Sequence, residues 1–368
     1  MNGNSSFLRI RITLLAALAV LLGVASSCSS EAGNKSVLAA PPGGVLLQGA
    51  GATFPSPLYK EWFATYHAEH PKTLVTYDVV GSGEGIRRFL GQNLKKEDER
   101  VDFGASDAAL RDDQLVEVPK GALMLPVTAG SVVLAYNLPD FQGELKLSRR
   151  AYTGIFLGQI KNWNDPLIAK SNPGVKLPRL TIARVVRQDG SGTTYAFTRH
   201  LDAINDEWRA RYGPALLVNW PGDAMRATGN EGVAGRIKQS VGSIGYVNFE
   251  FARKIGLKFA TLENKEGNYI RPSVSAGTTA LAGAQLPENL RVFIPDPLGA
   301  DAYPIVTFTW ILLYKNYPDS AKATAIRDLF HWCLTDGQKY SADLGYMPLP
   351  PNVAQKAISA LDGITPQK

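Results

Sequence analysis

The feature that most limits the possible folds of this chain is a recurring junction between two kinds of segment. An apolar, strand-like run ends in small or hydroxyl residues, and a helix-like segment follows. The clearest example is residues 187–194, RQDGSGTT, which come directly after the apolar run 180–186. Beyond them Phe197, Leu201 and Ile204 recur at steps of four and three, the spacing of one helix face.

Comparable junctions occur three more times. Thr53, Ser82 and Asp107 each lie at or just beyond the end of a strand-like run, at 45–48, 74–80 and 101–107. Strands that alternate with helices and show no internal repeat favour an α/β fold with mainly parallel sheets covered on both faces. In open α/β sheets the ligand lies beyond the carboxyl ends of the strands. The four junctions are therefore predicted to meet at one binding site.

The groups at these junctions suit a small tetrahedral oxyanion. Backbone N–H groups and hydroxyls at the positive end of a helix bind anions, and a guanidinium can hold two oxygens at once. Asp189 is placed to hold Arg187 in position. The candidate ligands are the hydroxyls of Thr53, Ser82, Ser191 and Thr193, the N–H groups of Phe54 and Gly192, the Arg187 guanidinium and the Asp107 carboxylate.

Asp107 is the unexpected member of this set, because a carboxylate only accepts hydrogen bonds. It can pair with an oxyanion that still carries a proton, such as hydrogen phosphate, and it repels sulfate, which has none at neutral pH. An Asp that merely ends a strand or caps a helix is the alternative interpretation. The pattern predicts selectivity for phosphate by repulsion of its competitor.

Catalytic chemistry has little support in the sequence. The four histidines are scattered, no cluster has the spacing of metal ligands, and there is neither a nucleophile elbow nor a phosphate-binding P-loop. A Ser191–His200 dyad stays open as an alternative, although no spacing favours it, and so does a secreted phosphatase. We expect a binding protein that is not an enzyme and has no cofactor and no metal.

Charge and length set broad limits. The 39 basic and 33 acidic residues give a net charge of +6 over 368 residues. The basic residues are spread along the chain, which is weak support for a nucleic-acid partner and mild support for an anionic ligand. The length predicts about two domains.

The first residues have the pattern of a targeting segment. Arg9 and Arg11 precede an apolar stretch, 12–24, that is short for a membrane span. The sequence LGVASSC then resembles a bacterial lipoprotein cleavage box that ends at Cys28, with Ala25 where Leu or Val is usual. We predict a signal peptide at 1–27, lipidation of Cys28 and a flexible tether at 28–45; simple secretion is the alternative. Cys333, on the apolar face of a late helix, is expected to be buried.

Several of these stretches together carry a family resemblance. The sequences GAGATFP at 49–55, GASD at 104–107 and RQDGSGT at 187–193 resemble the phosphate-binding proteins of bacterial high-affinity phosphate ABC transporters. Supporting stretches are FLGQIKNW at 156–163, GNEGV at 229–233 and GSIGYV at 242–247. The resemblance extends over about residues 46–350 in the same order.

The resemblance implies a two-lobed periplasmic binding protein of the type-two class, with phosphate buried in the cleft between the lobes. Lobe 1 would be 46–127 and 305–368, and lobe 2 would be 128–304. The lobes would close by hinge bending, and an inner-membrane ABC permease with its ATPase would accept the ligand. The family's ligands match Thr53, Phe54, Ser82, Asp107, Arg187, Ser191, Gly192 and Thr193, with Asp189 orienting the arginine.

The sequence departs from the family pattern in three places. Gly83 stands where a second serine is common, the charged run 95–100 looks like an insertion, and 221–228 lacks the usual glycine-rich stretch. These departures affect the rim of the site more than the identity of its ligand. Residues 261–291 are polar and poorly periodic, so a loop-rich surface excursion of unknown role is expected there.

Overall fold

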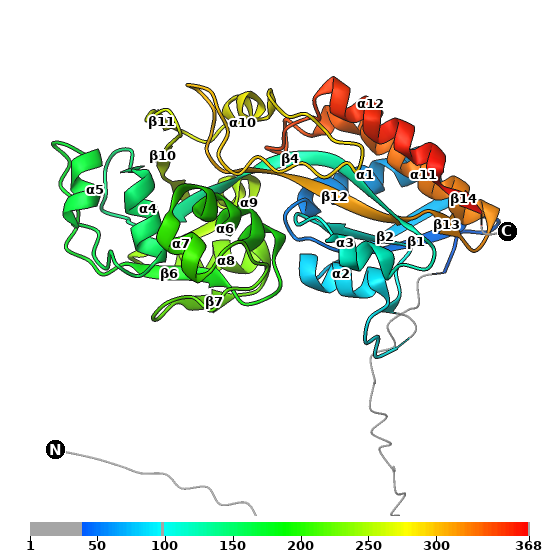
Figure 1. Ribbon diagram of the computed structural model, residues 1–368, viewed down its shortest axis with the longest axis horizontal. Coiled ribbons are helices and arrows are strands. Elements are labelled where there is room, and N and C mark those ends of the chain that lie inside the picture. Colours follow the sequence, from blue (N-terminus) through cyan, green and yellow to red (C-terminus); the bar gives the residue numbers. More distant parts are fainter. Residues whose placement is uncertain (1–38, 97–98, 367–368) are drawn as a thin grey trace, which may run out of the picture. The chain divides into compact units, whose positions relative to one another are not determined.

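The computed structural model describes residues 39–96 and 99–366 (Figure 1). The compact unit Ala40–Lys368 contains the α/β fold that is described below. The predicted signal peptide and Cys28 lie outside the described residues. No helix in the part of the chain that the structure describes is both long enough and apolar enough to span a membrane.

The first group of elements is built from three parallel strands in the order β2-β1-β3. The chain alternates strand and helix here, so each helix covers the strands it connects. The elements are β1 (Val45–Gly51), α1 (Ser56–Glu69), β2 (Thr73–Val79), α2 (Ser82–Leu90), β3 (Phe103–Ser106) and α3 (Asp112–Val116).

The second group of elements is likewise built on three parallel strands, in the order β8-β6-β7. Helix α6 follows β6 as the 187–194 junction predicts, and α8 follows β7 in the same way at a junction that was not predicted. The elements are β5 (Lys146–Leu147), α4 (Arg149–Phe156), α5 (Pro166–Ser171), β6 (Ala183–Arg187), α6 (Gly192–Ile204), α7 (Asp206–Arg211), β7 (Met225–Ala227), α8 (Gly229–Gln239), β8 (Ser243–Asn248), α9 (Phe249–Lys254) and β9 (Lys258–Phe259).

Two long strands, β4 (Ala122–Tyr136) and β12 (Val306–Tyr314), join the groups (Figure 1). β4 pairs with β12 up to Ser131 and with β8 from Val132 onward, and β12 also pairs with β3. All these pairings are antiparallel, since one strand leaves the first group and the other returns to it. The prediction of mainly parallel sheets is therefore right for the outer strands and wrong for the two strands that cross.

Among the remaining elements, the prediction for residues 261–291 has to be corrected. The predicted loop-rich excursion at 261–291 contains two short strands and an eight-residue helix, α10, whose Ser273 cap the sequence analysis overlooked. The elements are β10 (Thr261–Glu263), β11 (Tyr269–Ile270), α10 (Val274–Leu281), β13 (Asn316–Tyr317), α11 (Ser320–Leu334), a 3-10 helix (Asp336–Tyr340), α12 (Pro351–Ala360), a second 3-10 helix (Leu361–Gly363) and β14 (Thr365–Pro366).

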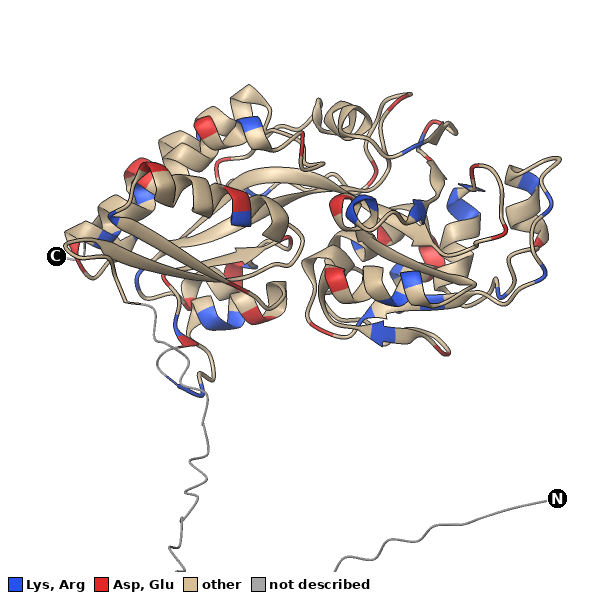
Figure 2. Cartoon of the chain, turned by 180° about the vertical axis from the view of Figure 1, so that it is seen from behind, with Lys and Arg blue, Asp and Glu red and all other residues tan. Residues whose placement is uncertain are grey.

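The core is one continuous cluster of buried apolar side chains that runs through both groups. Every residue of β12 is buried, which accounts for the unbroken apolar run in its sequence. Cys333 is a buried free thiol in α11, as predicted. In Figure 2 the Lys and Arg positions are interspersed with the Asp and Glu positions along the ribbon of both groups.

Gly85 offers a test of how closely α2 packs on the strands beneath it. A Cβ atom at this position would lie 2.5 Å from the Gly51 Cα and 2.9 Å from the Ala105 carbonyl oxygen, and neither backbone atom can move aside cheaply. We expect Gly85→Ala to lower the free energy of unfolding by about 2 kcal/mol through overpacking. Urea denaturation of the ligand-free protein measures the change.

Gly235→Ala is the matched control, because Gly235 lies inside α8 and a Cβ there would have no heavy atom within 4 Å. This change should raise the free energy of unfolding by roughly 0.5–1 kcal/mol, since glycine disfavours a helix interior. Equal stability of the two variants would contradict the described packing of α2.

Candidate anion-binding site

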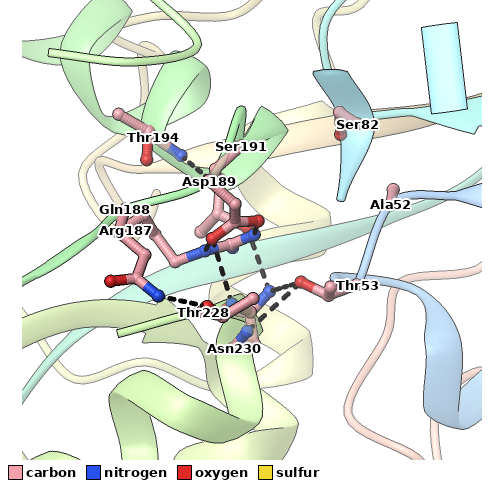
Figure 3. Close-up of polar contacts among 12 residues, drawn as sticks. Ala52, Thr53, Ser82, Arg187, Gln188, Asp189, Ser191, Thr194, Thr228 and Asn230 are labelled. Atoms are coloured by element: carbon pink, nitrogen blue, oxygen red, sulfur yellow. Dashed lines mark hydrogen bonds and ion pairs between the residues drawn. The ribbon is translucent and has the colours of Figure 1, made fainter. Parts of the chain in front are cut away.

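The predicted junctions meet where strands of both groups end. β1 leads to Thr53, β3 leads to Asp107, and α2 begins at Ser82; from the other group, β6 ends at Arg187 and α6 begins at Gly192. Figure 3 shows Thr53 and Ser82 on segments that lie across from the Arg187–Ser191 turn. Hydrogen bonds and close approaches bring together five of the predicted ligand residues: Thr53, Ser82, Asp107, Gly192 and Thr193. Arg187 is joined to them through Asp189, which accepts from the Gly229 N–H next to Asn230. Phe54 and Ser191 are the chain neighbours of Thr53 and Gly192.

Arg187 is fixed along one edge only. Its side chain is 2% exposed, and Nε donates to Asp189 Oδ1 over 2.7 Å while Nη2 is paired with Asp189 Oδ2. The remaining nitrogen, Nη1, is buried and has no hydrogen-bond partner among the described residues. A buried donor without a partner is costly, so this nitrogen is suited to a ligand oxygen.

Asp189 is held as a carboxylate. Burial alone pushes its pKa upward, but hydrogen bonds and the charge of Arg187 outweigh burial, and the pKa lies below its ordinary value. The Gly229 N–H adds a hydrogen bond of 3.1 Å to Oδ1. The predicted role of Asp189, to hold the arginine, agrees with this geometry. Because the pair is neutral overall, the guanidinium contributes direction and donors more than net charge.

The N-terminus of α6 supplies backbone donors. Ser191 caps the helix, and its Oγ accepts from the Thr194 N–H over 3.0 Å. The first N–H groups of a helix have no partner within the helix, so those of Gly192 and Thr193 can donate to a ligand. The Thr194 hydroxyl and the Arg187 N–H both bond to the buried Tyr246 hydroxyl, which ties the end of β6 to the start of α6.

Asn230, at the start of α8, is a residue that the sequence analysis did not assign to the site. Its Nδ2 donates to Thr53 Oγ1 over 2.8 Å (Figure 3). The same Nδ2 donates to Thr193 Oγ1 over 3.1 Å, so one side chain joins the two groups. Its Oδ1 accepts from the Asn248 N–H, which fixes the orientation of the amide. The sequence did contain a signal for Asn230, because this residue lies between a strand, β7, and a helix, α8, at a fifth strand-to-helix junction.

Ser82 and Asp107 approach α6 very closely. A Cβ atom on Gly192 would lie 2.5 Å from Ser82 Oγ and 2.6 Å from Asp107 Oδ2. Only glycine therefore fits at position 192, because either side chain would be displaced by a larger residue. Ser82 Oγ in turn accepts from the Asp107 N–H over 3.3 Å, which links the start of α2 to the end of β3.

The Asp107 carboxyl is 1% exposed. Burial raises its pKa to about 7, although the Thr309 hydroxyl and the charge of Arg187 act in the opposite direction. Thr309 Oγ1 donates to Oδ1 over 2.8 Å. Sequence analysis missed Thr309, and its only signal is a polar residue inside the apolar run of β12.

Phe54 contributes through its backbone. Its ring is buried against Gly130, where a Cβ atom would lie 2.6 Å from the ring, and its carbonyl accepts from the Tyr346 hydroxyl over 2.6 Å. This packing fixes the loop between β1 and α1. The Phe54 N–H belongs to this loop, directly after Thr53 and two residues before α1 begins at Ser56.

The Ser191–His200 dyad is not formed. His200 is buried, and its Nε2 bonds to the Tyr152 hydroxyl while Nδ1 bonds to the Pro295 carbonyl. Burial lowers the pKa of His200 to about 4, so the ring is neutral at pH 7. Within residues 39–96 and 99–366, no group of three or more His, Cys, Asp or Glu side chains could hold a metal ion.

Comparison with known proteins places this architecture in a family. Residues 29–336 match the family described as the PBP superfamily domain. The phosphate-binding protein PstS of Pasteurella multocida is 36% identical over 313 residues, 84% of this chain and 88% of that protein. PstS of Methanocaldococcus jannaschii is 34% identical and covers 88% of this chain, with 87% of its own length matched.

A solved structure gives the same fold. The high-affinity periplasmic phosphate-binding protein PfluDING, bound with phosphate, superposes with a TM-score of 0.73 at 23% identity, over 86% of this chain and 93% of that one. The fold is thus the mixed α/β, two-lobed fold of the periplasmic phosphate-binding proteins. By the extent and level of these similarities, the chain belongs to the PstS phosphate-binding proteins of the PBP superfamily.

Proposed function

We propose that the protein binds hydrogen phosphate in the periplasm and delivers it to an ABC permease and its ATPase for import. The names of its relatives and the phosphate-bound neighbour support this proposal. The observation that carries it is the arrangement of the four site hydroxyls, each of which accepts a hydrogen bond from a protein N–H. The donors are Asn230 for Thr53 and Thr193, Thr194 for Ser191, and Asp107 for Ser82.

This arrangement turns the hydroxyls outward as donors. A hydroxyl has one hydrogen to give, and an N–H bond to its oxygen orients it so that the hydrogen points elsewhere. Thr53 Oγ1 accepts two such bonds, from the Asn230 backbone and side chain. Together with Arg187 Nη1 and the N–H groups of Phe54 and Gly192, the site offers many donors and a single acceptor, Asp107.

Such a site binds a dianion without an excess of positive charge. Arg187 is neutralised by Asp189, so most of the stabilisation must come from hydrogen bonds in a buried setting, where an unpaired charge costs several kcal/mol. Asp107 accepts the one proton of hydrogen phosphate. Sulfate would instead place an oxygen lone pair against the carboxylate.

Binding would be coupled to lobe closure. We propose the lobe boundaries 46–127 with 305–368, and 128–304; the change of partner of β4, from β12 to β8 between Ser131 and Val132, supports a crossing within a few residues of the first boundary. Contacts such as Asn230–Thr53 then form across the cleft, and the permease would read the closed state. The protein would be held at the membrane by lipid on Cys28, and it would act as a binding protein and not as an enzyme.

Removal of the Arg187 side chain tests the donor set. Arg187→Ala should weaken phosphate binding by more than about 2 kcal/mol, since it removes a charge-assisted contact and leaves Asp189 without its partner. Titration calorimetry on protein freed of bound phosphate measures the dissociation constant. The matched control is Arg226→Ala, which removes an exposed arginine from the neighbouring strand β7 and should leave the constant unchanged.

An Arg187→Ala protein that is folded and binds phosphate as tightly as wild type would show that the anion does not contact this guanidinium. A loss in Arg226→Ala of similar size would show that general positive charge, and not the geometry of the site, drives binding.

The charge of Asp107 should control sulfate exclusion. Below pH 7 the buried carboxyl gains a proton, because its pKa is raised to about 7, and a protonated carboxyl can donate to sulfate. We expect sulfate to compete with phosphate better at pH 5 than at pH 8. Asp107→Asn, which carries amide hydrogens at every pH, should admit sulfate at both pH values. Competition calorimetry with sulfate measures both effects.

Sulfate that competes equally poorly at both pH values, in the wild type and in Asp107→Asn alike, would rule out repulsion by Asp107. Binding of phosphate by Asp107→Asn should persist in a weaker form, which serves as the control that the site is still assembled.

A further inference from the structure

Residues 286–296, called the strap below, connect the two groups of elements a third time. The strap contains neither helix nor strand, and it falls inside the proposed lobe 2 by sequence. Its first part nevertheless contacts elements of the proposed lobe 1, and its last part contacts α4 and α6 of lobe 2. The change from one side to the other takes place at Phe293, whose ring centre lies 5.4 Å from that of Trp310 in β12 and also contacts α6.

The first part of the strap is bound near Asp107. Arg291 Nη1 donates to the Leu110 carbonyl over 3.0 Å, and Nη2 pairs with Asp112. Trp310 Nε1 donates to the Leu290 carbonyl over 2.8 Å. The Arg291 side chain is 17% exposed, whereas that of Asp112 is 86% exposed, so the bond to Leu110 is the better protected of the two.

These contacts hold the two segments that position the Asp107 side chain: the loop that follows β3 and the strand β12. Leu110 lies three residues after Asp107 in the same loop. Trp310 is the neighbour of Thr309, whose hydroxyl donates to Asp107 Oδ1. The strap therefore braces the loop that carries the carboxylate and the strand that orients it.

The last part of the strap is bound to the lobe that carries α6. The Arg199 guanidinium lies 4.1 Å from the centre of the Phe293 ring, and Tyr195 packs on the same ring. The Pro295 carbonyl accepts from His200, and Asp296 is paired twice with Arg149 at 2.8 Å. Tyr195, Arg199 and His200 all belong to α6, whose N-terminus supplies the anion donors.

The short span between the two anchors limits how far they can separate. Arg291 and Phe293 are two residues apart, and extended chain covers at most about 3.6 Å per residue. The Asp107 loop and α6 can therefore move apart by only a small distance while both anchors hold. Wider opening requires that one of them be released.

We propose that Arg291 is a positioning residue of the anion site. Through the strap it holds the Asp107 loop at a fixed distance from the N-terminus of α6, and so it keeps the carboxylate against the ligand's proton. This inference rests on the proposed binding of phosphate. It assigns a role to residues 286–291, the end of the 261–291 region, for which the sequence offered none.

The test compares Arg291→Ala with the wild type by calorimetry for phosphate and by competition for sulfate. We expect phosphate binding to weaken about tenfold, and the preference for phosphate over sulfate to fall at least threefold, because a loose carboxylate excludes sulfate less well. Arg291→Lys should restore part of both, since it keeps one donor for Leu110. Arg271→Ala, which breaks an exposed pair with Glu144 remote from the strap, should change neither.

A second variant reduces the ring contacts of Phe293 with Arg199 and Trp310, and it keeps the test valid if Arg291→Ala fails to fold. Phe293→Leu should weaken phosphate binding and lower the preference for phosphate over sulfate, as Arg291→Ala does. The double variant should lose little more than the larger single effect, because both changes release the same connection. If the fold losses in phosphate affinity of the two single variants multiplied in the double variant, the two changes would act independently, which would contradict a shared strap.

The outcomes separate this inference from the function on which it rests. A wild-type protein that does not bind phosphate would overturn the proposed function itself. A wild type that binds, with Arg291→Ala and Phe293→Leu equal to it in affinity and selectivity, would overturn the strap alone. Loss of stability in the variants with unchanged selectivity would likewise show that the strap is only structural.

Discussion

The pairing of Arg187 with Asp189 is the interaction on which the site depends. Two of the three guanidinium nitrogens, Nε and Nη2, bond to the Asp189 carboxylate, and Nη1 is buried without a partner in the described chain. It also removes the net charge that would otherwise attract any anion. A site of this kind must select by the number and direction of its hydrogen bonds, so the positions of the surrounding hydroxyls become decisive.

Those positions follow from the way in which the two groups of strands meet. Each junction presents a strand end and a helix start, and Gly192 permits the two sides to approach to a distance that no other residue would allow. Asn230 then couples Thr53 to Thr193 across the same boundary. In the proposed mechanism, closure of the lobes would assemble the donor set, and a partner could detect the bound ligand through the closed form without covalent chemistry.

The sequence predicted most of this arrangement because junction chemistry is local. Glycines, hydroxyl residues and the Arg187–Asp189 spacing can be recognised in short windows, and each has a direct physical reason. Thr309 and Asn230 act through contacts with residues 202 and 177 positions away, so no local pattern reveals their partners. The antiparallel central strands escaped prediction for the same reason. Pairing of β4 with β12 depends on a return crossing from one group to the other.

A crystal structure of the protein with phosphate tests the central claim most directly. The account predicts tetrahedral density at the junctions, with one oxygen within hydrogen-bond distance of an Asp107 carboxylate oxygen and another within the same distance of Arg187 Nη1. Tetrahedral density at another place, or in the site with Asp107 turned away from the anion, would contradict it.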